Sequence, residues 1–350
     1  MKRILLIIVF CLFCAACAPR AATVTTTITP AELAEPTAPL WTETATFPVQ
    51  PSPTVSQPTA TSLPEPTATE TQPPQITPTT IRGDSIWIDH TSVELFERIP
   101  DEYIQAASQI TWIYRHASVG DNISFGLNCM MNYFPDRADP SQRPSACDRD
   151  LAQSEIIIDP KYNRSNWHFE LHSPLPNPNP GWYNKAQYFI DRIDGLAEGE
   201  SYQVANFKFG YVEGTNINDH FFTNNIPDDN FPSVFDLEAL EDRHPEITFV
   251  WWTMGLARMS GPFTQEFNDR QRAYAVSNGK ILFDIADIES HKPDGTLCYG
   301  IDRDQNPTTI PSICPEYTNE VFAGHLNSIG RVRLAKAVWV LMAQLAGWTP

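Results

Sequence analysis

The chain reads ITWIYRHASVG over residues 110–120. Residues 110–114 are rich in β-branched and aromatic side chains, which predicts a buried β-strand. After Gly120, apolar side chains recur at helical spacing from Ile123 to Met131, so a helix should follow. Ser118 therefore lies on a tight turn between a strand and a helix, an arrangement that can present a reactive hydroxyl at the end of a sheet.

Strand-like and helix-like runs alternate through the rest of the domain. Further strands are expected at residues 85–89, 155–158, 202–212, 247–252 and 280–288. Further helices are expected from Pro100 onward and at residues 188–196, 235–243, 263–277 and 330–346. Residues 132–185 otherwise read as an irregular insertion, because Pro and Asn crowd them. The alternation predicts an α/β fold, a three-layer α/β/α sandwich with a mostly parallel, flavodoxin-like sheet.

The N-terminal segment has the order of a secretory signal. Residues 1–17 begin with Lys2 and Arg3, continue with an apolar run and end in small residues before Cys17. The end of this segment is similar to a bacterial lipobox, which predicts lipidation of Cys17. The alternative is an ordinary signal peptide cleaved near residues 18–22. In the lipobox interpretation the protein is a lipoprotein at the cell surface, and the lipid is its only contact with the membrane.

Residues 18–81 are expected to be a disordered linker. Between residues 23 and 80 there are 18 Thr and 12 Pro and no Lys or Arg. Such a composition cannot bury enough apolar surface to fold, and proline favours extended chain. Residues 82–350 then form one large domain.

The composition of this domain limits its partners and its covalent cross-links. It carries 21 basic and 37 acidic residues, so a polyanion would be repelled and nucleic acid is excluded as a partner. It also holds an even number of cysteines behind a secretion signal, which favours disulfides. Short loops favour the pairs Cys129 with Cys147 and Cys298 with Cys314.

A second candidate catalytic residue, His325, lies in the loop before the last predicted helix. A serine hydroxyl becomes a good nucleophile when an imidazole accepts its proton, and backbone amides at a helix start can bind the resulting oxyanion. Ser118 and His325 are therefore the predicted nucleophile and base. Gly120 and Asn122, at the start of the helix, are the predicted oxyanion or substrate contacts.

Two motifs at these positions resemble the SGNH/GDSL hydrolases. Residues 116–120 (HASVG) look like the HxSVG variant of the first block of that family, and residues 323–327 (AGHLN) look like its last block. Residues 208–212 and 283–289 also look like segments of that variant, so the resemblance covers residues 85–348. It implies hydrolysis of an ester, often an O-acetyl group on a carbohydrate, through an acyl-serine intermediate.

The sequence departs from the family pattern in the acid that orients the histidine. The family places an aspartate three residues before its histidine, and this position is Phe322 here. Glu320, close in sequence, and Asp287, at the end of a predicted strand, are the two candidate substitutes. The usual Gly-Asp-Ser block and the family's Gly-x-Asn-Asp oxyanion block are also missing.

Two further polar residues are candidate pocket residues. His116 directly precedes the turn, where it could line a pocket or simply pack. Lys208 falls inside an apolar strand, where an unpaired charge is costly, so a structural ion pair with Asp284 or Asp287 competes with a role in substrate binding.

No metal or cofactor is expected from the sequence. His168 and His172 have the spacing of a helical metal pair, but their aromatic and proline neighbours argue against a helix. Residues 302–306 begin like a calcium loop, but Pro307 occupies the required glycine position. Several aromatic residues could stack on sugars or pack in the core: Trp167, Trp182, Tyr183, Trp251 and Trp252.

The sequence thus predicts a secreted serine esterase that acts on a small-molecule or glycan ester. The alternative is a carbohydrate-binding or structural lipoprotein that has kept the fold but lost its acid.

Overall fold

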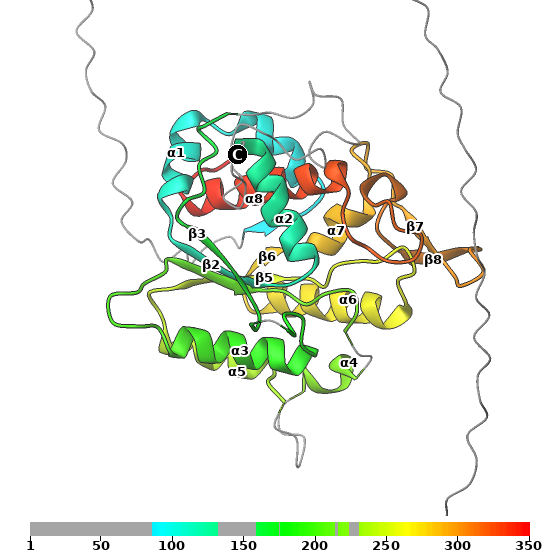
Figure 1. The fold of residues 1–350 in the computed structure, drawn as a ribbon, viewed down its shortest axis with the longest axis horizontal. Coiled ribbons are helices and arrows are strands. Elements are labelled where there is room, and N and C mark those ends of the chain that lie inside the picture. The colour runs from blue at the N-terminus through cyan, green and yellow to red at the C-terminus, as the bar shows by residue number, and fades with distance from the viewer. Residues whose placement is uncertain (1–85, 132–158, 175, 214–215, 224–230) are drawn as a thin grey trace, which may run out of the picture. The chain divides into compact units, whose positions relative to one another are not determined.

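The computed structural model describes residues 86–131, 159–174, 176–213, 216–223 and 231–350. These residues form a six-stranded sheet with helices on both faces and a separate two-stranded hairpin (Figure 1). The strands of the sheet are β1 (Trp87–Ile88), β2 (Trp112–His116), β3 (Trp167–Leu171), β4 (Val204–Phe207), β5 (Thr248–Trp252) and β6 (Ile281–Phe283).

The sheet is entirely parallel, in the order β1-β6-β5-β4-β2-β3. Without the added edge strand β1, this is the strand order of flavodoxin-like sheets. The predicted fold class is therefore confirmed. The order places β2, which precedes Ser118, between β3 and β4.

Two layers of helices cover the two faces of the sheet (Figure 1). One layer contains the 3₁₀ helix η1 (Ser92–Arg98) and the helices α1 (Asp101–Gln109), α2 (Val119–Met131) and α8 (Ser328–Leu345). The other layer contains α3 (Trp182–Asp194), α4 (Ile217–His220), α5 (Val234–Arg243) and α6 (Pro262–Ser277). Successive residues of β2 alternate between the layers: Trp112 and Tyr114 belong to the first core and Ile113 to the second. Strands covered on both faces read as continuous apolar runs, which is why they stood out in the sequence.

Several elements differ from their predicted limits. β4 ends at Phe207 because its partner β2 pairs with it no further than Arg115. The strand expected at 280–288 ends at Phe283, where Asp284 caps the short helix α7 (Ile285–Ser290) through its side chain. β3 pairs with β2 inside a region predicted as irregular. The strand expected at 155–158 lies outside the described residues.

The chain between α7 and α8 forms an excursion from the sheet. It contains the antiparallel hairpin of β7 (Tyr299–Ile301) and β8 (Pro307–Pro311), then the 3₁₀ helix η4 (Pro315–Tyr317). The loop that carries His325 follows directly. Among the described residues, no helix has the length and apolar character that a membrane crossing requires.

Candidate active site

Ser118 occupies a sharp turn between β2 and α2. Its backbone φ is +57°, in the left-handed region that residues with a side chain seldom adopt. The turn is tight enough that a Cβ on Gly120 would lie 2.3 Å from the Cβ of His116. Glycine at 120 thus lets the helix start directly above the end of the strand. The conformation raises the Ser118 hydroxyl beyond the carboxyl end of the sheet, where parallel α/β folds place their sites.

His325 meets Ser118 across 207 residues of sequence. The Ser118 Oγ lies 2.7 Å from the His325 Nε2, within hydrogen-bonding distance. Three contacts hold the histidine loop. The Thr318 hydroxyl donates to the His325 carbonyl at 2.7 Å, the Leu326 amide donates to Asn122 Oδ1 at 2.8 Å, and Asn327 caps α8.

Glu320 supplies a carboxylate on the other side of the imidazole. Its Oε1 lies 2.9 Å from His325 Nδ1, and its Oε2 accepts the His325 backbone amide at 2.7 Å. The two oxygens fix both the ring and the backbone of the histidine. Asp287, the other candidate acid, instead contacts His90 and His291. Phe322, at the position where the family has its aspartate, is a partly exposed apolar side chain.

Tyr211 is part of this cluster, although it was not predicted as a site residue. Its hydroxyl lies 3.1 Å from His325 Nδ1, and it also interacts with the Ser118 side chain. Burial raises the pKa of Tyr211, and the nearby Glu320 charge raises it further. The hydroxyl therefore keeps its proton at neutral pH and can donate beside Ser118.

Asn122, predicted as an oxyanion or substrate contact, also makes a contact that positions the histidine loop. Its Oδ1 is occupied by the Leu326 amide, so any contact with an oxyanion falls to the Nδ2 hydrogens. Asn122 thereby links the helix that follows Ser118 to the loop that carries His325.

His116 is buried beneath the turn, packed against Tyr114 and Phe169. Burial, together with the positive charges of Lys208, Arg164 and Arg115, lowers the pKa of His116 to about 3. The imidazole is neutral at physiological pH. Its position under the turn fits the packing interpretation.

Lys208 is also buried, and its electrostatic partner is Glu289 on α7, not Asp284 or Asp287 as the sequence suggested. Asp284 pairs with Arg272. Burial lowers the pKa of Lys208 and raises that of Glu289. A Glu289 oxygen accepts the Leu256 amide at 2.6 Å, which ties α7 to the chain after β5.

One predicted disulfide joins Cys298 to Cys314. Cys129 is also disulfide-bonded, and its predicted partner Cys147 lies outside the described residues, as does Cys17.

The residues weighed as a metal pair or as sugar platforms lie mainly in strands and the core. His168 and His172 lie on and just after β3, not on a helix, and His172 is buried. Residues 302–306 form the turn between β7 and β8, where Asp302 accepts the Asn306 amide. Four of the five aromatic candidates are buried, and only Tyr183 is exposed.

No family model matches the sequence, and no curated protein does. Two solved structures align with it. A provisional lipolytic protein of the G-D-S-L family from Desulfitobacterium hafniense has 12% identity, covering 65% of this chain and 98% of its own, with a TM-score of 0.30. A candidate lipase from Chitinophaga pinensis has 13% identity, covering 68% of this chain and 99% of its own, with a TM-score of 0.34.

Proposed function

We propose that the protein is a serine ester hydrolase in which Ser118 is the nucleophile, His325 the general base and Glu320 the orienting acid. One observation carries the proposal: the unbroken path from the Ser118 hydroxyl through both nitrogens of His325 to Glu320. Each contact is within hydrogen-bonding distance, as base catalysis by an imidazole requires. Glu320 supplies the carboxylate whose absence at residue 322 motivated a non-catalytic alternative.

In the first half-reaction the Ser118 oxygen attacks the ester carbonyl carbon while its proton passes to His325 Nε2. Glu320 stabilises the imidazolium that forms and keeps Nδ1 protonated. The imidazolium then protonates the departing alcohol as the acyl-oxygen bond breaks. In the second half-reaction water attacks the acyl-serine, gives its proton to His325, and the carboxylic acid leaves as Ser118 recovers its proton.

The negative oxygen of each tetrahedral intermediate needs donors that are already in place. The Ser118 amide at the start of α2 is one such donor. The Tyr211 hydroxyl is a second, since it lies beside both Ser118 and His325 and retains its proton. Asn122 Nδ2 is the third donor on this side of the site.

For the substrate, the proposal is a small acyl ester. The family resemblance suggests a carbohydrate as the alcohol half. The four buried aromatic candidates lend no support to that half, because sugar stacking needs an exposed ring. Hydrolysis of p-nitrophenyl acetate tests the acyl half of the ester. Its comparison with hydrolysis of acetylated oligosaccharides tests the alcohol half.

The central test is hydrolysis of p-nitrophenyl acetate by the purified full-length chain. We expect Ser118→Ala and His325→Ala to lose the activity, and Glu320→Gln to lower kcat by up to about 10⁴-fold, because a neutral amide cannot stabilise the imidazolium. Glu316→Gln is the matched control, since Glu316 lies in the same segment but pairs with Lys292. Activity that survives in Ser118→Ala would refute the proposal, as would a parent chain inactive towards every ester tested.

A further inference from the structure

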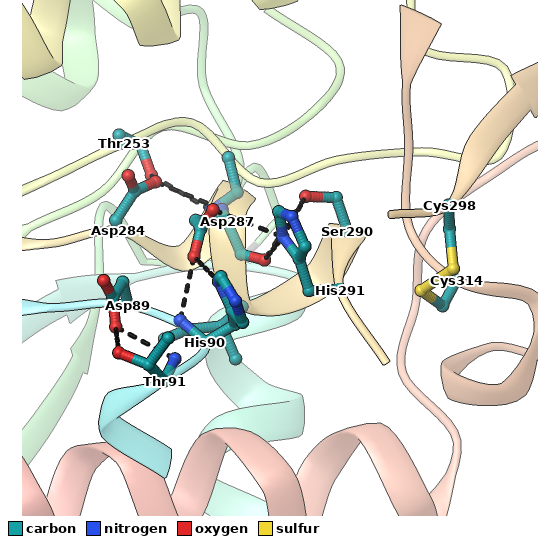
Figure 2. Close-up of polar contacts among 12 residues, drawn as sticks. Asp89, His90, Thr91, Thr253, Asp284, Asp287, Ser290, His291, Cys298 and Cys314 are labelled. Atoms are coloured by element: carbon teal, nitrogen blue, oxygen red, sulfur yellow. Dashed lines mark hydrogen bonds and ion pairs between the residues drawn. A yellow bond between two sulfur atoms is a disulfide. The ribbon is translucent and has the colours of Figure 1, made fainter. Parts of the chain in front are cut away.

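A second polar cluster lies at the carboxyl end of the edge strand β1, apart from the serine site. It consists of His90, two residues after β1, and of Asp287 and His291, which lie on α7 and at its end (Figure 2). Asp287 and His90 are separated by 197 residues in the sequence. The sequence alone therefore gave no sign of this cluster.

Each oxygen of the Asp287 carboxylate contacts one of the two imidazoles. His90 Nδ1 lies 2.5 Å from Oδ2, and His291 Nδ1 lies 3.2 Å from Oδ1. The two imidazole rings stack with centroids 3.9 Å apart and planes 12° from parallel. One ligand atom from each of the three residues lies within 4.8 Å of the other two. Two imidazoles and a carboxylate are thus already gathered at one place, where His291 Nδ1 also lies 2.9 Å from the Asp287 carbonyl oxygen.

The backbone holds the cluster in place. The His90 amide donates to Asp287 Oδ2 at 2.8 Å, and the Asp287 amide donates to Asp284 Oδ1 at 3.1 Å. Asp284 is itself fixed by Arg272. It also accepts the Thr253 hydroxyl (Figure 2). Such outer contacts orient ligands before an ion arrives.

The donor set identifies the class of ion. Two imidazole nitrogens with one carboxylate oxygen suit zinc and similar divalent transition metals, whereas calcium and magnesium prefer oxygen ligands only. The side chains of His90, Asp287 and His291 are 23, 21 and 18% exposed, so an ion can enter from solvent and a water can complete a tetrahedral set.

We propose that His90, Asp287 and His291 form a binding site for one zinc-class divalent ion. The imidazoles bind as neutral ligands and Asp287 as a carboxylate, so any proton shared between them passes to solvent. The bound ion joins β1 to α7, two elements that are far apart in the sequence but adjacent in the fold. The site is distinct from the serine cluster, and its role is structural: the His291 carbonyl also accepts the Tyr317 hydroxyl at 2.9 Å, just before the histidine loop.

The test is calorimetric titration of the full-length, metal-stripped chain with Zn²⁺. We expect one saturable site per chain, and His90→Ala and His291→Ala should each weaken it by at least about 100-fold, since even outer-shell changes cost about 10–100-fold. His244→Ala is the matched control. His244 is similarly exposed and lies 2.8 Å from Asp194 and 3.5 Å from Glu246, but has no second imidazole in contact.

Loss of Zn²⁺ binding in both test variants, with binding retained in His244→Ala, supports the site. Binding that persists in either test variant overturns it, because the ion would then sit elsewhere, for example on the thiols of residues 11, 14 and 17. A parent chain with no saturable Zn²⁺ binding also overturns it. If an alanine variant does not fold by circular dichroism, Asp287→Asn replaces it, because the amide oxygen can still accept the His90 amide while the charge needed by the ion is gone.

Discussion

The backbone of Ser118 stores strain at the point where the chemistry is proposed. Apart from glycines, the described residues include only two with positive φ, Ser118 and Gln305. Gln305 lies in the exposed β7–β8 turn, where such a conformation is ordinary, but Ser118 joins two buried elements. A left-handed conformation costs a residue with a Cβ about 1–2 kcal/mol. The surrounding packing therefore sustains a local cost that keeps the hydroxyl exposed.

Replacing Ser118 in two ways separates this strain from the loss of the hydroxyl. We expect Ser118→Gly to be more stable to urea than Ser118→Ala by about 1 kcal/mol, because glycine adopts positive φ without a Cβ clash. Both variants lack the nucleophile and should be equally inactive. Equal unfolding free energies for the two variants would show that the backbone at Ser118 is not strained.

Tyr211 gives a second prediction at the scale of single residues. Tyr211→Phe removes only the hydroxyl beside Ser118, so we expect kcat to fall by roughly 10²-fold, the usual cost of one oxyanion donor. KM should change little, because the donor acts mainly on the transition state. Steady-state kinetics with p-nitrophenyl acetate provide the measurement. A change confined to KM would show that Tyr211 binds substrate instead.

At the scale of elements, the junction of β2 with α2 depends on a neutral imidazole. His116 ends β2, lies under the turn and is 4% exposed. Its closeness to Gly120 is what fixes the entry of α2. Protonation of His116 would bury a charge in this junction, close to the positive charges of Lys208, Arg164 and Arg115, at high cost.

Because His116 is neutral in this junction, we expect the folded protein to lose stability in acid. Burial lowers the pKa of folded His116 from its ordinary 6.5 to about 3, so on acidification the unfolded chain takes up this proton first. The stability contributed by neutral His116 is fully present above about pH 6.5. It is lost as the pH falls from 6.5 to 3, by roughly 1.4 kcal/mol of unfolding free energy per pH unit. His116→Gln should reduce the slope of unfolding free energy against pH by this amount. His168→Gln, at an exposed residue of β3, should not, and an unchanged slope in His116→Gln would refute the assignment.

At the scale of the whole molecule, the domain has a strong negative charge and a Thr- and Pro-rich segment before it. We propose that the protein is tethered outside the cell by a lipid on Cys17, with residues 18–81 as a spacer. The signal-like residues 1–17 support this placement.

The tether gives a prediction that concerns location, not chemistry. In the Cys17→Ala chain we expect the protein to leave the membrane fraction, with the proposed esterase activity per molecule unchanged, because Cys17 lies far along the chain from Ser118 and His325. Cell fractionation with activity assays is the measurement. Membrane association unaltered by Cys17→Ala would refute the lipid anchor.

Sequence patterns marked residues at the boundaries of local elements, but they missed residues that only the fold brings together. Ser118 and His325 were predictable because each sits at a boundary between recognisable elements. Glu320 was one of two candidates, and only the loop geometry separates it from Asp287. Tyr211 and His90 were not predicted as site residues, because no residue pattern marked either of them and only the fold brings them to partners 114 and 197 residues away. β3 was hidden among irregular segments because its pairing with β2 depends on a distant strand.

The packing of α8 also determines when, during synthesis of the chain, the proposed catalytic site can form. This helix contacts β1, η1, α1 and α2, so a segment made late completes a core begun by segments made much earlier. His325 is positioned by Asn122 on α2 and by the capped start of α8. A growing chain still attached to the ribosome, with α8 inside the exit tunnel, therefore holds Ser118 without its base. The proposed catalysis therefore cannot begin before α8 has left the tunnel and packed.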